Sequence, residues 1–204
     1  SNLLIERHGY LSALTADKLR WVNRLLELEL RDRPGQMHYL IEYGRNLLRL
    51  NDPHGHDVLA EAAEQMLRAK DAPFPPTATA AFLLEYLLTV SPAQSRSGVD
   101  ADLASTLANR WFPASPPLLW VMAQKAFEAQ DYRNAADLLE RMIALGRSGG
   151  FDQSSGFDQS IMGAPALLNL GICYLRLEDL ARAEHYFGQL LTDPTHGGKA
   201  QRGY

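Results

Sequence analysis

Two short clusters in the sequence have the residue types of a metal site. Asp100–Ala101–Asp102 has the Asp-x-Asp form that can hold Mg²⁺ or Mn²⁺ against a nucleotide diphosphate. His54–Gly55–His56–Asp57 offers imidazole and carboxylate donors, but no nearby residue completes a tetrahedral site. Because apolar residues follow the aspartates at helical spacing, we expect the aspartates to open a helix, where the helix dipole favours acidic groups. We expect a helix-start turn at the histidines, and neither a metal nor a cofactor in the chain.

A third motif could carry covalent chemistry. Arg7–His8–Gly9 follows the apolar residues Leu3–Leu4–Ile5, and it resembles the Arg-His-Gly signature of histidine phosphatases. That resemblance implies a nucleophilic histidine and a phosphate-binding arginine at the end of a strand. Such an enzyme needs an α/β sheet, and the chain has only five valines and five isoleucines with which to build one. We therefore predict no catalytic residue in this chain and keep the phosphatase as a remote alternative.

The composition favours helices throughout. The 204 residues include 34 leucines and 26 alanines, both good helix formers, which predicts an all-α fold with a sizeable core. Twenty basic residues against 24 acidic ones give a net charge of −4, so we expect no nucleic-acid partner. No apolar run reaches the roughly 18–20 residues that span a membrane. The single cysteine, Cys173, fits a reducing compartment and predicts a cytoplasmic protein.

Hydrophobic periodicity predicts about nine helices and no strand. We expect a proline-rich break at Asp71–Pro76 and a polar loop at Ser91–Gly98. The expected helices cover residues 16–32, 37–50, 57–70, 77–90, 99–111, 117–129, 132–145, 164–177 and 180–191.

Internal repetition is the strongest signal in the chain. A small residue in one helix, then a polar–Asp turn, then a small residue in the next helix recurs around Gly44, Ala123 and Gly171. The small residues allow two paired helices to approach closely. The copy at 164–194 matches the tetratricopeptide pattern best, with Gly171, Tyr174, Ala183, Phe187 and Pro194. The sequence therefore predicts a stack of tetratricopeptide-like helix pairs.

One insertion interrupts this repetition. Asp131 and Asp179 are 48 residues apart, against about 34 in a tetratricopeptide repeat, so about 14 residues are extra. The segment 149–160 supplies them and contains Phe-Asp-Gln-Ser twice. One interpretation is a flexible surface loop produced by a local duplication. The other is a partner-binding loop in which Phe151 and Phe157 are exposed anchors.

A second resemblance spans nearly the whole chain. At its N-terminal end the chain resembles the junction in bacterial family 2 glycosyltransferases with C-terminal tetratricopeptide repeats, through Ile5, His8–Gly9–Tyr10, Lys18, Asn23, the Leu-Leu and Glu-Leu pairs that follow, and Tyr43–Gly44. Later residues also resemble that region: Phe157–Asp158, Leu170–Gly171, Cys173–Tyr174, Pro194 and Ala200.

Because the chain does not begin with Met, we expect Ser1–Asn2 to be the scar of a cleaved tag. The resemblance implies that the rest of residues 1–15 is the junction from an absent catalytic domain. It implies that residues 16–204 form a right-handed α-solenoid. No donor-binding or metal residue of that family can be carried over to this chain.

These observations predict a non-catalytic module for protein–protein interaction or intramolecular docking, with a protein or peptide partner such as its own catalytic domain. A free-standing tetratricopeptide adaptor is the alternative. In stacked helix pairs the first helix of each pair lines the concave face, where repeat proteins usually bind. If the three small residues mark equivalent positions, a set of aromatic and arginine side chains faces the concave side, and such side chains are common in binding hot spots. The alternative is that the aromatic residues belong to the core and the arginines to a solvated face. These candidates are Arg45, Arg49, Trp120, Gln124, Phe127 and Arg176.

Overall fold

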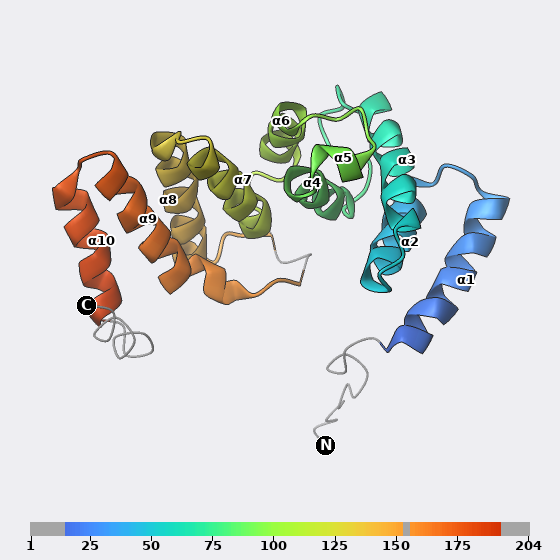
Figure 1. Cartoon of the computed structure of the whole chain (residues 1–204), viewed down its shortest axis with the longest axis horizontal. Helices are drawn as coiled ribbons and strands as arrows, with labels where there is room; N and C mark the ends of the chain where they lie inside the picture. The colour runs from blue at the N-terminus through green and yellow to red at the C-terminus, as the bar shows by residue number, and fades with distance from the viewer. Residues whose placement is uncertain (1–14, 153–155, 193–204) are drawn as a thin grey trace, which may run out of the picture. The chain divides into compact units, whose positions relative to one another are not determined.

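The computed structural model describes residues 15–152 and 156–192 of the chain. Across these residues the chain forms ten α-helices and one short 3₁₀-helix, with no strand (Figure 1). The all-α prediction is confirmed. Arg7, His8 and Gly9 lie outside the described residues, as does the rest of the expected junction. No helix in the described ranges is both long enough and apolar enough to cross a membrane.

The element order follows the chain and agrees closely with the nine predicted helices. The helices are α1 (Ala16–Asp32), α2 (Met37–Arg49), α3 (His54–Arg68), α4 (Ala80–Thr89), α5 (Pro92–Ser95), α6 (Ala101–Trp111), α7 (Pro116–Glu128), α8 (Tyr132–Ser148), η1 (Gln159–Met162), α9 (Ala164–Arg176) and α10 (Leu180–Thr192).

Two local predictions need correction. Helix α3 begins three residues earlier than the periodicity indicates, because the Asp52 carboxylate accepts a 3.0 Å hydrogen bond from the backbone N–H of His54. The polar segment Ser91–Gly98 is not purely a loop, because it contains the single turn of α5. Ser91 has the extended backbone of an N-cap, and Arg96 ends the turn in the left-handed conformation at φ 48°.

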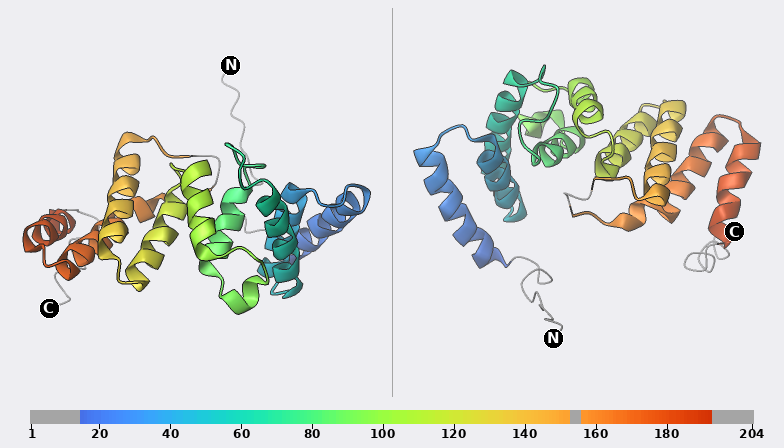
Figure 2. Two further views of the ribbon diagram at one scale, coloured as in Figure 1. Left: turned by 90° about the horizontal axis from the view of Figure 1, so that it is seen from above. Right: turned by 180° about the vertical axis from the view of Figure 1, so that it is seen from behind.

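The described chain divides into two compact units, each considered by itself. The first contains α1, α2, α3 and α5, and includes the residues up to Ala69 with Ser91–Gly98. Helices α2 and α3 lie side by side (Figures 1 and 2). A Cβ atom on Gly44 would lie 2.7 Å from Leu59 Cγ, so glycine is what lets the two helices approach. The segment around Arg96 is held to this unit by the ion pair between Arg96 and Asp57.

The second unit comprises Lys70–Val90 and the chain from Val99 onward. Its helices pack as the pairs α7–α8 and α9–α10, and α8 also packs on α9 (Figure 2). Helix α4 contacts both α6 and α7. Trp111 Nε1 donates to the carbonyl oxygen of Ala72 at 3.0 Å, which ties the proline-rich break to α6. Consecutive helix pairs therefore build this unit.

The turns within three helix pairs share one geometry. At Asn51, Gln130 and Glu178 the backbone is left-handed, with φ between 58° and 62°. The aspartate that follows each of them donates its backbone N–H to a carbonyl five residues earlier, at 2.9–3.0 Å. Its carboxylate then accepts a backbone N–H of the next helix, at 3.0–3.2 Å. This is a Schellman C-cap followed by an aspartate whose side chain accepts from the start of the next helix, and it explains the polar–Asp signature in the sequence. Asp131 is itself the N-cap of α8, whereas Asp52 precedes Pro53, the N-cap of α3.

Replacing the left-handed residue Gln130 with glycine should stabilise the second unit. Gln130 is exposed at φ 62°, a conformation that costs a residue with a Cβ atom about 1–2 kcal/mol. We expect Gln130→Gly to raise the free energy of unfolding by about 0.5–1 kcal/mol, after the entropy cost of glycine. Urea unfolding followed by circular dichroism measures it. Ala129→Gly is the control, because Ala129 is at φ −77° and glycine there should destabilise. Equal effects of the two substitutions would contradict the turn assignment.

The insertion between α8 and α9 packs on the second unit. The backbone N–H of Asp152 donates to the carbonyl oxygen of Ala114 at 2.9 Å, and η1 contacts α7, α8 and α9. Phe151 and Phe157 are both half-buried, and their rings meet edge to face with centroids 5.7 Å apart. The two phenylalanines of the duplicated motif therefore pack on each other.

Candidate functional site

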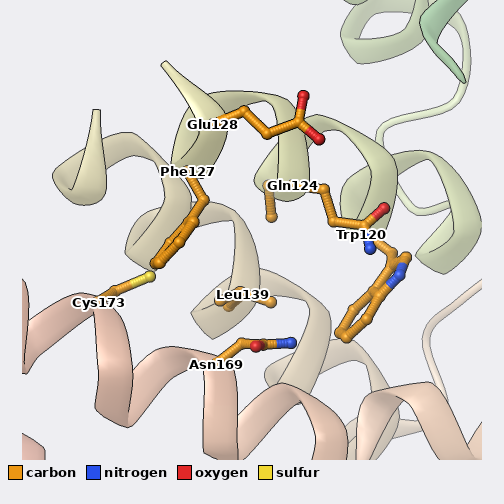
Figure 3. Close-up of a pocket in the computed structure, with 8 residues that line it drawn as sticks. Trp120, Gln124, Phe127, Glu128, Leu139, Asn169 and Cys173 are labelled. Carbon is orange, nitrogen blue, oxygen red and sulfur yellow. The ribbon is translucent and has the colours of Figure 1, made fainter. Parts of the chain in front are cut away.

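A pocket of about 290 Å³ opens between α7, α8 and α9 (Figure 3). Helix α7 supplies one wall, α9 supplies the opposite wall, and α8 contributes a single side chain. The pocket therefore lies between the first helices of two consecutive pairs. Its lining residues are Trp120, Ala123, Gln124, Phe127, Glu128, Leu139, Asn169 and Cys173.

The walls of the pocket are mostly apolar and held in place by packing. Phe127 is half-buried, and its ring contacts Tyr132 in a T-shaped arrangement with centroids 5.1 Å apart. Its ring points toward Cys173 (Figure 3). Leu139 is 3% exposed and Cys173 fully buried. Ala123 leaves the space that a larger residue would fill. A pocket of this size and lining suits one apolar side chain of a partner.

Cys173 belongs to the wall rather than to any chemistry. Burial raises the pKa of its thiol to about 11. At neutral pH the group is therefore a protonated thiol, whereas the thiolate is the nucleophile and the metal ligand. Its complete burial makes Cys173 a small residue of the core.

Three polar side chains border the pocket. Gln124 is exposed and Asn169 is half-buried, and each carries a carboxamide that can both donate and accept hydrogen bonds. Glu128 is exposed and forms an ion pair with Lys125 at 3.0 Å. The pocket thus combines apolar walls with two carboxamides, the composition typical of a binding site.

Helix α9 also carries apolar side chains on a side other than the one that lines the pocket with Asn169 and Cys173. Leu168 and Leu175 are 47% and 49% exposed, and Ile172, between them, is half-buried. The spacing of four and three residues places all three on one face of the helix. We call these three residues the α9 ridge.

The structure brings together three of the six predicted concave-face residues. Trp120, Gln124 and Phe127 line one pocket. Arg176 is exposed on α9, three residues after Cys173, and makes no hydrogen bond or ion pair in the part of the chain that the structure describes.

All the residues that line the pocket belong to the second unit, whereas Arg45 and Arg49 belong to the first. They are one turn apart on α2, and Arg45 forms an ion pair with Glu42 at 3.4 Å. Burial lowers the pKa of the Arg49 guanidinium, and the like charge of Arg45 lowers it further. Glu42 thus pairs with Arg45, and its negative charge offsets only part of these two effects on the pKa of Arg49.

Asn169 and the α9 ridge were missed by the sequence analysis. Trp120, Gln124 and Phe127 lie three residues before, one after and four after Ala123. The same offsets from Gly171 give Leu168, Ile172 and Leu175, so the repeat register contained the signal for the ridge. Asn169 has no such counterpart, because the α7 residue at its offset, Val121, is buried.

The two metal-type clusters have structural roles. Asp100 caps α6 by accepting a 2.7 Å hydrogen bond from the backbone N–H of Leu103, so the expected helix start is confirmed. Asp57 pairs with Arg96, and His54 Nδ1 lies 3.5 Å from its other oxygen. These contacts hold the pKa of the Asp57 carboxyl below its usual value, the hydrogen bond from Arg96 having the largest effect. Within the described residues no three potential metal ligands lie together.

Comparison with known proteins adds no assignment. No protein-family model matches the chain, and no curated protein matches it either. The pocket and the helix pairs that form it are therefore the features that point to a function.

Proposed function

We propose that the chain is a non-catalytic helical-repeat module that docks a protein or peptide segment in the pocket between α7 and α9. The observation that supports this most directly is the pocket itself. Three side chains chosen from repeat register alone, Trp120, Gln124 and Phe127, line one apolar pocket. Aromatic side chains around a partly enclosed pocket are the groups that contribute most binding free energy at protein interfaces.

The repeated turns support a tetratricopeptide-like solenoid. Three pairs share the Schellman turn and the aspartate cap, and each of the small residues Gly44, Ala123 and Gly171 is buried. In the proposal these pairs stack as a right-handed array. The array is the C-terminal part of a cytoplasmic bacterial glycosyltransferase, and the docked segment belongs to the catalytic domain of that enzyme.

A displayed peptide library tests the docking function. Random peptides on phage are selected on the whole chain, and binding is then measured to Trp120→Ala and Phe127→Ala. Each variant should lose about tenfold or more in affinity, the loss of a binding hot spot. Phe74→Ala is the matched control, because Phe74 is 76% exposed outside the pocket. Selected peptides that bind both pocket variants as tightly as the parent chain would overturn the pocket as the docking site.

A further inference from the structure

We infer that the docked segment places a tyrosine in the pocket, with its ring between Trp120 and Phe127 and its hydroxyl bonded to the Asn169 carboxamide. The inference rests on the proposed docking function and deepens it by naming the anchoring side chain. Three features of the pocket support it: the spacing of its two aromatic rings, the unpaired carboxamide of Asn169, and the neutral character of its lining.

Two aromatic rings of α7 leave a gap of the width that a third ring fills. Trp120 and Phe127 are seven residues apart, which is about 10 Å along the helix axis. Both rings extend from α7 toward α9 (Figure 3), and Ala123, between them in the helix, has only a methyl group. Packed aromatic rings have centroids about 4.5–7 Å apart. A ring inserted in this gap therefore lies about 5 Å from each neighbour and contacts both.

The enclosure favours an aromatic anchor over an aliphatic one. Pairs of aromatic rings gain binding free energy beyond that of the apolar area they bury. Leu139 and Cys173, both buried, complete the apolar walls around the gap. The volume of about 290 Å³ equals roughly ten water molecules at about 30 Å³ each. A phenol ring and part of the backbone that carries it fit in this space.

The carboxamide of Asn169 requires a polar group on the anchor. The side chain is half-buried, points into the pocket (Figure 3) and makes no hydrogen bond to any other described residue. A partner that covers this carboxamide without bonding to it leaves a polar group buried and unsatisfied, which costs binding free energy. A phenol hydroxyl both donates and accepts a hydrogen bond, as the carboxamide does. Tyrosine therefore satisfies Asn169, whereas phenylalanine and leucine do not.

The lining also selects a neutral anchor. Of the described residues that line the pocket, Glu128 is the one that is charged at neutral pH, and Lys125 engages it at 3.0 Å. A carboxylate, phosphate or ammonium group placed between the two rings would lose its hydration without gaining an opposite charge. Tyrosine remains neutral up to about pH 10, so it brings a hydrogen-bonding group into the pocket without this cost.

The test measures how four blocked amino acids bind the whole chain. The probes are the N-acetyl amides of tyrosine, phenylalanine, leucine and tryptophan. NMR follows the indole N–H signal of Trp120, which the variant Trp120→Phe identifies. Probes of this size should bind with a dissociation constant on the order of 1 mM. The tyrosine probe should bind about fivefold more tightly than the phenylalanine probe, the effect of one net hydrogen bond. It should bind about tenfold more tightly than the leucine probe, and more tightly than the tryptophan probe, whose N–H only donates.

Asn169→Leu tests the hydrogen bond. In this variant the tyrosine probe should lose its preference over the phenylalanine probe, because no carboxamide remains to pair with the hydroxyl. Asn134→Leu is the matched control, because Asn134 is exposed on α8 and does not line the pocket. It should leave the preference unchanged. The NMR spectrum of each variant shows whether the fold is retained, and the comparison of probes on the parent chain does not depend on any substitution.

The outcomes separate the tyrosine from the docking function. Equal binding of the tyrosine and phenylalanine probes, or a preference that survives in Asn169→Leu, would overturn the tyrosine anchor. Tighter binding of the leucine or tryptophan probe would overturn it too, as would no shift at several times the expected dissociation constant. In each case the docking function stands if library peptides lose affinity in Trp120→Ala. If library peptides bind independently of Trp120 and Phe127, the docking function itself fails.

Discussion

Replacing Gly171 with leucine should destabilise the second unit by about 1–3 kcal/mol, the usual cost of overpacking a core. Gly171 is buried in α9, where the ring of Phe187 on α10 lies directly against it. A Cβ atom added at Gly171 would lie 2.5–2.9 Å from three atoms of that ring. Real Cβ atoms do not approach ring carbons this closely, so the ring or the whole of α10 must move. The expected close helix contact at Gly171 is confirmed.

Gly188 provides the matched control for this substitution. It lies in α10, next to Phe187, and a Cβ atom there would meet no other atom within 4 Å. Gly188→Leu should be neutral or stabilising, because leucine has the higher helix propensity by roughly 0.5–1 kcal/mol. Urea unfolding followed by far-ultraviolet circular dichroism compares the two variants. A Gly171→Leu chain that unfolds like the parent would show that α9 and α10 do not pack at this register.

The sequence predicts most of the helices because their signals are local. Leucine and alanine periodicity and the Asp100 and Asp131 caps lie within the helices or just before them. Apart from α3 and α4, which begin three residues before and three residues after the predicted start, the predicted helices begin within two residues of prediction. The start of α3 was missed because its signal is a hydrogen bond that the backbone N–H of His54 donates to the carboxylate of Asp52, an aspartate before a proline. The turn of α5 was missed because its ion pair joins Arg96 to a helix 39 residues earlier. Hydrophobic periodicity is recognised over a short stretch of sequence, which does not include both residues of such a contact.

The candidate site was predictable only in part, for a similar reason. Repeat register places Trp120, Gln124 and Phe127 on one face of α7, because that face depends only on helical spacing. Whether this face of α7 is covered by other side chains or borders a pocket depends on the residues opposite it. Asn169 and Cys173 make that wall, and they come from a helix that follows the insertion between α8 and α9. The sequence could not place Phe151 against Phe157 either, since the ring contact depends on how the insertion folds.

The largest polar effect that we expect in the second unit concerns Glu140 of α8. Its Oε1 atom accepts hydrogen bonds from the hydroxyls of Tyr174 on α9, at 2.6 Å, and Tyr186 on α10, at 2.9 Å. The two rings stack with centroids 5.6 Å apart and planes 7° apart. The guanidinium of Arg182 lies over the Tyr174 ring, 4.5 Å from its centroid. One carboxylate thus ties three consecutive helices together.

Glu140→Ala should lower the free energy of unfolding by about 2 kcal/mol. The hydroxyls of Tyr174, which is buried, and Tyr186, which is half-buried, then lose a charged hydrogen-bond acceptor. Glu140→Gln should cost less, since its carbonyl oxygen still accepts a hydrogen bond. Asp137→Ala on the same helix is the control, because Asp137 is exposed and should have little effect. Urea unfolding near neutral pH measures all three. Equal losses in Glu140→Ala and Asp137→Ala would show that the tyrosine hydrogen bonds add nothing to stability.

The same cluster should make stability depend on alkaline pH. Burial, then the hydrogen bond to Glu140, raises the pKa of Tyr186 to about 12, and the same two causes raise the pKa of Tyr174. An unfolded tyrosine titrates near pH 10. A pKa raised on folding means that the folded chain holds the proton more tightly, so the stabilisation is complete below about pH 10 and is lost as the pH rises through the folded value. The free energy of unfolding of the parent chain should therefore fall between about pH 10 and pH 12. In Glu140→Ala the fall should be shallower, because the hydrogen bonds and charge of Glu140 no longer raise the two pKa values. Parallel pH profiles for the two chains would contradict the assignment of this stabilisation to Glu140.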